Sequence, residues 1–217
     1  MPMLTEQNDI PAVLKQFWER HAGDTPLRGR MVVGVSGGAD SLALLHGLKT
    51  TTAVSTQQLT AVYVNHGLRP EAPQEAQFVT NIAQAWGIAV QVRPVDVDTA
   101  VLTNHSLEEA ARLLRYRALV ACAREVGANA ILVAHTADDQ AETVLMHLLR
   151  GSGLRGLRGM RPISPLPRSL SDGRGPLWVV RPMLAVWRKD IEAYCLHEGL
   201  TPVEDASNQD TAYFRNA

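Results

Sequence analysis

The sequence predicts an α/β fold: a doubly wound parallel sheet of about five strands with helices on both faces. Short runs rich in valine and isoleucine recur at residues 31–35, 59–65, 88–95, 130–134 and 177–181. Strands that are apolar on both sides are typical of a sheet buried between two helical layers. Between these runs lie segments whose apolar residues follow helical spacing, and this alternation favours parallel strands joined by right-handed crossovers.

Most of the intervening helices carry a sequence signal at one end. An apolar pattern with helical spacing follows Asp9, and Pro73 suits the first turn of a later helix. Ser106 begins a capping box before a long helix that we expect to end at Gly127. Thr136 then lies where it can cap the next helix.

Length and composition predict one globular domain. The chain has 217 residues, of which 46% are hydrophobic and 20% charged, enough to bury a core without disulfides or metal. We expect a single catalytic domain over residues 1–217, with an N-terminal helix and linker over 1–28. No apolar run approaches the roughly 20 residues of a membrane span. The acidic N-terminus does not resemble a signal peptide, which predicts a cytoplasmic protein.

Two further features concern cysteine and charge. Cys122 and Cys195 form no C-x-x-C pair, so we expect half-buried thiols on helices rather than a disulfide or a zinc site. The net charge is only −1, yet residues 150–189 hold nine basic side chains and one acidic one. Such a stretch indicates a surface that faces a polyanion, unless arginine merely solvates a loop. Residues 151–176 contain six glycines and four prolines, which predicts a long loop.

The most informative segment is a turn of small residues between the first strand and the next helix: Ser36, Gly37, Gly38, Ala39, Asp40 and Ser41. Glycine lets the backbone turn and approach a ligand closely. Consecutive N–H groups at a helix start form an anion site that the helix dipole reinforces. The turn is therefore predicted to bind phosphate, and a tight turn without a ligand is the plain alternative.

Three familiar glycine motifs compete for this turn. A Walker A loop requires a lysine, and the chain has none between Lys15 and Lys49. The dinucleotide motif G-x-G-x-x-G fails at Ser36. The nucleophile elbow G-x-S-x-G matches residues 34–38, and this leaves a hydrolase as a minor alternative. Against the hydrolase, about 30 residues precede this strand, whereas that fold places several strands there, and no HGGG-type segment is present.

The turn resembles, residue for residue, the S-G-G-x-D-S motif of the PP-loop ATP pyrophosphatase superfamily. The resemblance implies that the turn holds the β- and γ-phosphates of ATP, which leave as pyrophosphate while the α-phosphate is transferred to an oxygen. It also implies that Asp40 helps to bind Mg²⁺, a cation that prefers carboxylate oxygens. The motif alone leaves thiolation enzymes, amide synthetases and lysidine synthetases open.

Further matches narrow the choice. Segments 65–71, 109–116, 135–143, 148–157, 181–184 and 204–208 closely resemble the tRNA(Ile)-lysidine synthetase family. The resemblance implies ATP-dependent ligation of L-lysine to carbon 2 of the wobble cytidine of tRNA(Ile) with a CAU anticodon, through an adenylated cytidine. It is also compatible with a homodimer. A thiolation-type PP-loop enzyme, or a nucleotide-binding module without turnover, is the alternative. The absence of a C-x-x-C pair favours lysidine formation.

The resemblance assigns roles to individual residues. Asp138 and Glu142, four residues apart on one helical face, would bind the lysine substrate, and Asp139 would join Asp40 as a Mg²⁺ ligand. The residues alone leave open which of these carboxylates serves lysine and which serves the metal. Together with Arg112 these carboxylates form the predicted catalytic set, although an acid-rich first turn also suits the helix dipole. ATP would further contact two histidines that follow strands, His66 and His135.

Arginines are the predicted contacts to tRNA: Arg115, Arg150, Arg155, Arg158 and Arg161. Arg112 and Arg115 have an alternative in ion pairs with Glu108 or Glu109. Members of the family commonly continue into C-terminal domains that grip tRNA, whereas this sequence ends at Ala217. We therefore expect intact adenylation chemistry and weak tRNA binding.

Overall fold

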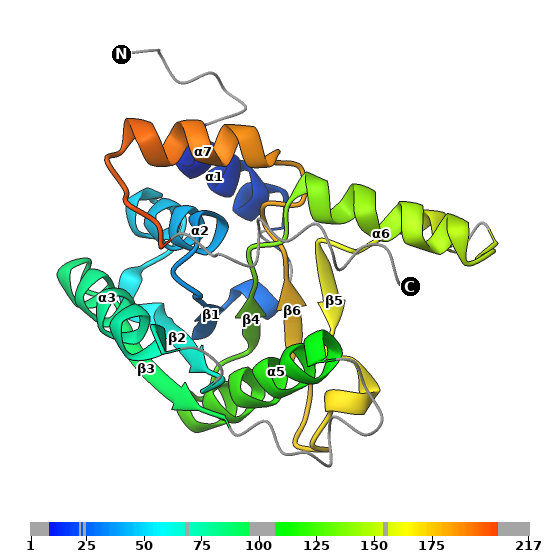
Figure 1. Cartoon of the computed structure of the whole chain (residues 1–217), viewed down its shortest axis with the longest axis horizontal. Helices are drawn as coiled ribbons and strands as arrows, with labels where there is room; N and C mark the ends of the chain where they lie inside the picture. The colour runs from blue at the N-terminus through cyan, green and yellow to red at the C-terminus, as the bar shows by residue number, and fades with distance from the viewer. Residues whose placement is uncertain are drawn as a thin grey trace.

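The computed structural model describes residues 9–21, 23, 25–67, 70–95, 107–153 and 156–203. A six-stranded sheet in the order β3-β2-β1-β4-β6-β5 forms its centre (Figure 1). The strands are β1 (Met31–Gly34), β2 (Leu59–Asn65), β3 (Ala89–Pro94), β4 (Ala130–Leu132), β5 (Ile163–Pro165) and β6 (Trp178–Val180). All neighbouring strands are parallel except β5 and β6, which are antiparallel.

Six α-helices are described with the sheet: α1 (Ile10–Arg20), α2 (Ala39–Thr50), α3 (Ala72–Ala85), α5 (Leu107–Val126), α6 (Ala137–Leu149) and α7 (Arg188–His197). Short 3₁₀ turns lie at Thr25–Leu27, Thr56–Gln58, Gly156–Arg158 (η3) and Arg168–Leu170 (η4). Within the described residues, none of these helices has the length and apolar character that a membrane span needs.

The predicted fold class is confirmed, with one strand more than expected. The five predicted strands are the parallel strands of the sheet, and their ends agree within two residues. The additional strand β5, together with η3 and η4, lies inside segment 151–176, which the composition had predicted to be a loop. Pro162 precedes β5 and Pro165 is its last residue, so the sequence does not look like a strand. Proline is nevertheless tolerated in an edge strand, and β5 lies at an edge of the sheet.

The described helices cover the two faces of the sheet unequally. On one face, α1, α2, α3 and α7 pack with alternate residues of β1, β2 and β4 in a large core that includes Leu44, Leu45 and Tyr194. On the other face, α5 packs through Leu119 and Ala123 on the remaining strand residues. Helix α6 has no buried side chain and extends away from the sheet, as Figure 1 shows. The prediction of helices on both faces is thus confirmed.

Both cysteines lie on helices, as predicted, but burial is greater than expected. Cys122 on α5 is 0% exposed and Cys195 on α7 is 4% exposed, so the prediction of half-buried thiols was wrong. Each thiol faces one of the two hydrophobic cores, where a small apolar side chain packs well.

Two of the predicted capping residues form hydrogen bonds at the starts of their helices. Asp9 Oδ1 accepts a hydrogen bond from Ala12 N at 3.2 Å and caps α1. Thr136 and Asp139 form a reciprocal capping box at α6. The capping residue predicted for α5, Ser106, lies outside the described residues.

Helix α7 is fixed to α2 by a buried polar contact. His46 Nδ1 and the Tyr194 hydroxyl are 2.7 Å apart, and both side chains are buried. Burial lowers the pKa of His46 and raises the pKa of Tyr194, so both groups stay neutral near pH 7. This buried contact joins α7 to α2.

The strand order determines where a ligand site belongs. The chain moves outward from β1 to β2 and β3, then returns to the opposite side of β1 to form β4. The carboxyl ends of β1 and β4 therefore lie side by side at a topological switch point, where crevices in open α/β sheets bind ligands.

Candidate active site

A cavity of about 590 Å³ opens at this switch point. Its walls come from the carboxyl ends of β1, β2 and β4, the starts of α2 and α3, and one face of α5. The volume falls within the range of about 300–1,000 Å³ that is usual for small-ligand sites. Eight of the predicted site residues line it: Ser36, Asp40, Ser41, His66, Arg112, Arg115, His135 and Asp139.

The turn at residues 36–41, which the sequence predicts to bind phosphate, is stabilised by hydrogen bonds of its two serines. Ser41 Oγ accepts from Ser36 N at 3.1 Å, lies 3.2 Å from Ser36 Oγ, and donates to Gly38 O at 3.0 Å. Gly38 N in turn donates to Ser36 Oγ at 3.4 Å. The side chains thus rigidify the turn, and the first N–H groups of α2 have no partner within the helix and are available to a phosphate.

Gly37 is the residue of this turn whose backbone requires glycine. Its φ is +90°, a conformation that side-chain-bearing residues rarely adopt. Its carbonyl accepts a hydrogen bond from Val203 N at 3.0 Å, which ties the segment after α7 to the turn. Gly37, Gly38 and Ala39 form the back of the turn and do not themselves line the cavity.

Asp40 carries a carboxylate that the protein satisfies only in part. Oδ2 lies 3.5 Å from Arg188 Nη2 in an ion pair that is partly exposed. Oδ1 is buried and accepts no hydrogen bond from any described residue. Burial raises the pKa of Asp40, with Asp139 and Asp138 adding to the rise and Arg188 opposing it. An acceptor left in this condition, facing a cavity, is suited to a cation.

The two aspartates at the start of α6 have structural contacts as well as a place near Asp40. Asp138 Oδ2 accepts from Arg188 N at 2.8 Å and so caps α7. Asp139 Oδ2 accepts from Thr136 N at 2.7 Å and from Thr136 Oγ1 at 3.0 Å. One oxygen of each acid is therefore used in a contact at the start of a helix, α7 for Asp138 and α6 for Asp139. Asp139 also lines the cavity, whereas Asp138 does not.

Other predicted residues lie along α6 and beyond it. Glu142 is exposed one turn after Asp138 and does not line the cavity. Arg150, Arg158 and Arg161 are exposed after the end of α6, and Arg155 lies outside the described residues. The structure does not bring these arginines to the cavity wall.

His135 is oriented by Arg181, a residue that the motif contained but to which no role was assigned. Arg181 Nε donates to His135 Nδ1 at 3.1 Å, so the second ring nitrogen of the neutral imidazole carries the proton. Burial, with Arg181 beside it, lowers the pKa of His135 to about 4. His135 is consequently a neutral hydrogen-bond donor at the cavity.

A buried pair of residues at the cavity, Tyr63 and Glu75, was missed in the sequence. The Tyr63 hydroxyl donates to Glu75 Oε2 at 2.7 Å, and both residues are buried and line the cavity. A tyrosine in a strand and a glutamate in a helix carry no motif, so only the packing of α3 on β2 reveals them. The sequence analysis included Arg188 only as one of the basic residues of 150–189. Its ion pair with Asp40 could not be predicted, because the two residues are far apart in the sequence.

The donor set fits a Mg²⁺ ion that is bound chiefly through phosphate. Among the residues that the structure describes, no three His, Cys, Asp or Glu side chains are arranged to hold a metal alone. Mg²⁺ commonly uses one or two carboxylates together with substrate phosphates and water. Asp40, with its unpartnered Oδ1 beside the phosphate-binding turn, supplies such a ligand.

A largely parallel sheet with a glycine-containing turn after β1, a carboxylate within that turn and a cavity at the switch point is the arrangement typical of α/β nucleotide-binding proteins. Comparison with known families makes this class specific. The profile of the PP-loop domain matches residues 8–217, and the chain belongs to this family.

Curated relatives agree. The chain is 39% identical over 216 residues to the tRNA(Ile)-lysidine synthase of Dehalococcoides mccartyi, covering 99% of this chain and 44% of that protein. It is 41% identical over 187 residues to the enzyme of the same name from Novosphingobium aromaticivorans, covering 86% and 54%. The chain thus spans about half the length of the curated relatives it matches.

A solved structure supports the fold. The U34-tRNA thiolase NcsA from Methanococcus maripaludis, described with its [4Fe-4S] cluster, aligns with a TM-score of 0.66 over 94% of this chain and 72% of that one. The sequences are 17% identical, so the likeness concerns the fold alone.

Proposed function

We propose that this domain ligates L-lysine to carbon 2 of the wobble cytidine of tRNA(Ile) with a CAU anticodon, using ATP. The observation that carries the proposal is the cavity at the switch point, where the S-G-G-x-D-S turn, His135 and two arginines of α5 face one another. Relatives named tRNA(Ile)-lysidine synthase, similar over 86–99% of the chain, support the choice of reaction.

The first step is transfer of adenylate. The carbon-2 oxygen of cytidine attacks the α-phosphorus of ATP, and the bond to pyrophosphate breaks. Backbone N–H groups at the start of α2 would hold the departing phosphates. Asp40 would hold Mg²⁺, which when bound neutralises charge on the phosphates. His135, neutral and with its proton on Nε2, would donate a hydrogen bond to the reacting nucleotide.

The second step uses lysine. Its ε-amine attacks carbon 2, the bond to the AMP oxygen breaks, and the amine loses a proton. Asp138 and Glu142 share a face of α6, and we propose that they bind the lysine ammonium and that the acidic cluster with Asp139 takes up the proton. The sum is ATP, lysine and cytidine giving lysidine, AMP and pyrophosphate. A cytoplasmic location and a homodimer remain predictions from the N-terminal sequence and the family resemblance.

A thiolation enzyme is the weaker alternative. The chain has two cysteines in all, and both are buried in different cores. Cysteine-held iron–sulfur clusters commonly need four thiolates. No observation therefore favours this function.

Lysine transfer tests the proposal directly. The chain is incubated with ATP, MgCl₂, radiolabelled lysine and excess tRNA(Ile) transcript, and label in RNA and released pyrophosphate are measured. Asp40→Asn removes a carboxylate charge beside the phosphates, so we expect loss of transfer by about 100-fold or more. The matched control Glu192→Gln, at an exposed site of α7, keeps full transfer. Wild-type protein that transfers no lysine, or an active Asp40→Asn variant, contradicts the proposal.

A further inference from the structure

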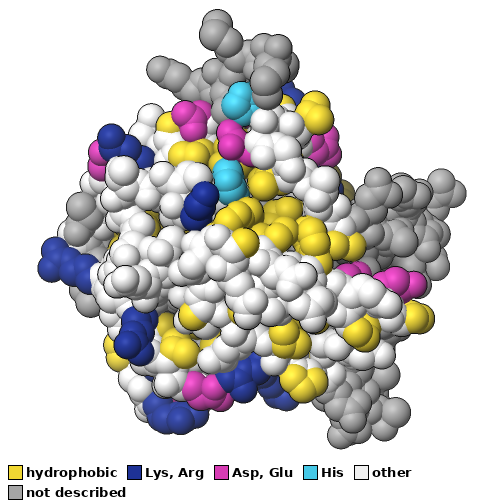
Figure 2. All heavy atoms as spheres, turned by 90° about the vertical axis from the view of Figure 1, so that its left-hand side faces the viewer, with side chains coloured by type: hydrophobic (Ala, Val, Ile, Leu, Met, Phe, Trp, Pro, Cys, Tyr) yellow, Lys and Arg dark blue, Asp and Glu magenta, His cyan; other side chains and the backbone are white. Residues whose placement is uncertain are grey.

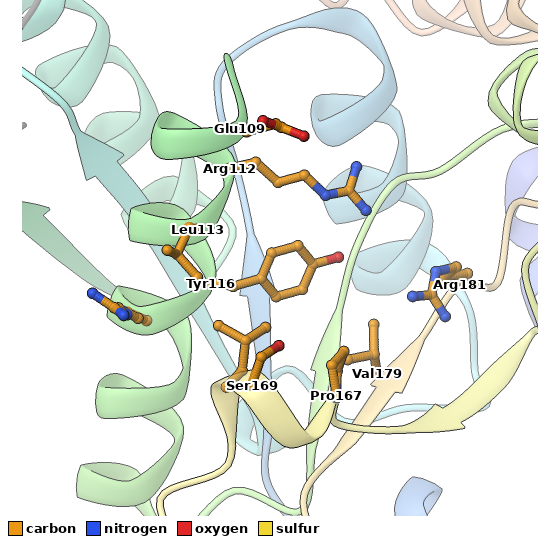
Figure 3. Close-up of a pocket in the computed structure, with 10 residues that line it drawn as sticks. Glu109, Arg112, Leu113, Tyr116, Pro167, Ser169, Val179 and Arg181 are labelled. Atoms are coloured by element: carbon orange, nitrogen blue, oxygen red, sulfur yellow. The ribbon is translucent and has the colours of Figure 1, made fainter. Parts of the chain in front are cut away.

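A second cavity of about 520 Å³ adjoins the cavity at the switch point. We call the cavity at the switch point the nucleotide cavity, because we propose that it binds ATP. It lies between α5, η4 and the end of β6, as the close-up in Figure 3 shows. Arg112 and Tyr116 line both cavities, so these two side chains form the wall that the cavities share. No role has so far been given to this second cavity.

The walls of the second cavity suit a flat aromatic ring. Tyr116 projects from α5 into the space between Arg112 and η4, with its ring in the middle of the view in Figure 3. The tyrosine is only 7% exposed and is held firmly. Leu113 and Leu170 add aliphatic walls. Aromatic and aliphatic surfaces of this kind stack on nucleobases.

The charge of the lining favours an anion attached to that ring. Three arginines, Arg112, Arg117 and Arg181, line the cavity together with one acidic residue, Glu109. The Arg112 guanidinium lies 5.7 Å from the centre of the Tyr116 ring. Such a lining repels the lysine ammonium and attracts phosphate. A base that carries a phosphate is a nucleotide.

One face of the molecule carries mixed charge. Figure 2 shows the side of the molecule at the left of Figure 1, away from η4 and β5, where Lys and Arg side chains are dispersed and several lie beside acids. The basic stretch 150–189, by contrast, supplies η4 and Arg181 to the second cavity.

The second cavity also communicates with the proposed reaction centre. Arg181 lines it and donates through Nε to His135, which lines the nucleotide cavity. Arg181 is held there by Ser164 Oγ at 3.0 Å and by the Arg161 carbonyl at 3.1 Å. A base in the second cavity would therefore lie across Arg112 and Tyr116 from a nucleotide in the first, because these two side chains line both cavities.

We propose that the second cavity binds the acceptor nucleotide of the RNA, with its unstacked base against Tyr116 and its backbone phosphate at Arg117. This inference rests on the proposed function, because it locates the cytidine that receives the adenylate. Arg117 is the discriminating residue, since it lines the second cavity and not the first.

A charge reversal at Arg117 tests the proposal. An anticodon stem–loop with 5-iodocytidine at the wobble position is photocrosslinked to the chain, and the attached peptide is identified by mass spectrometry. We expect attachment within the lining of the second cavity, at Tyr116 or in η4. Arg117→Glu should lower crosslinking by about tenfold or more, because a phosphate contact becomes a repulsion.

Arg168→Glu is the matched control. Arg168 is exposed on η4 and does not line the cavity, yet its reversal changes the net charge equally. We expect crosslinking within about twofold of wild type there, and unchanged ATP affinity in both variants. Attachment to a peptide outside the lining, or equal effects of the two reversals, overturns the inference. Specific attachment without lysine transfer by the wild-type chain would instead refute the proposed function alone.

Discussion

Single residues in this site have two tasks, and Asp139 shows how they combine. One oxygen closes the capping box with Thr136 and sets the start of α6, while the residue also lines the nucleotide cavity. Asp138 likewise caps α7 through Arg188 N. The sequence could indicate acids at a helix start, but it could not separate the helix-dipole interpretation from the ligand-binding one, because both need the same residues at the same spacing. The structure adds a contact at a helix start for one oxygen of each acid, and ligand binding stays a prediction.

The imidazole of His135 makes a prediction about pH. Its pKa is about 4 in the folded protein against 6.5 as the ordinary value. Between these values the unfolded chain binds a proton that the folded protein does not, so the free energy of unfolding falls as pH drops from 6.5 towards 4. His135→Gln cannot take up this proton. We expect urea midpoints of the variant to fall less than those of wild type between about pH 7 and about pH 5.

The His135→Gln variant should keep some pH dependence of stability, because burial also lowers the pKa of His46. A pH dependence of stability in His135→Gln as steep as in wild type would show that the imidazole is protonated in the folded state.

At the scale of elements, the sequence correctly predicted the strands, caps and turns that depend on residues close together in the chain. The five parallel strands, the Thr136 cap and the turn at Gly37 each depend on residues close together in the chain. Strand β5 and the pairing of Arg188 with Asp40 depend on partners far away in sequence. Motif spacing likewise placed Ser36, Asp40, His135 and Arg112 around one cavity, but it gave no sign of Tyr63 or Glu75.

The arginine-rich segment after α6 is fixed by one glutamine. Gln140 Nε2 donates to Met160 O at 3.0 Å, and Gln140 Oε1 accepts from Met160 N at 2.7 Å. Gly159, at a φ of +57°, lets the backbone pass this amide closely. Gln140→Ala removes both bonds, so we expect faster tryptic cleavage after Arg158, which Gly159 follows. The control Gln84→Ala, at an exposed site on α3, should be cleaved like wild type.

Equal cleavage of the two glutamine variants would mean that contacts other than Gln140 hold the segment. Cleavage is to be followed at short times, where each cut reports local opening rather than unfolding of the domain.

On the scale of the whole molecule, stability and reactivity are separated. The cores on the two faces of the sheet hold the fold, whereas α6 carries predicted substrate residues and has no buried side chain. Leu44 on α2 is 0% exposed and Leu149 on α6 is 74% exposed. Leu44→Ala should lower the free energy of unfolding by about 2–5 kcal/mol. Leu149→Ala should lower it by about 0.5 kcal/mol or less.

Chemical denaturation of both variants checks this separation. A loss at Leu149 as large as at Leu44 would show that α6 packs against another surface in solution, which is the result a homodimer through this helix would give.

The hydrogen bond from Val203 N to Gly37 O has a mechanical consequence. It joins the segment after α7, through a single hydrogen bond, to the main chain of the turn that we propose holds the phosphates of ATP. If RNA binding displaced the segment that contains Val203, the displacement would reach Gly37 through this hydrogen bond and would not have to pass through the hydrophobic core. Binding of ATP and binding of tRNA would then both affect the hydrogen bond that the Val203 amide donates to Gly37.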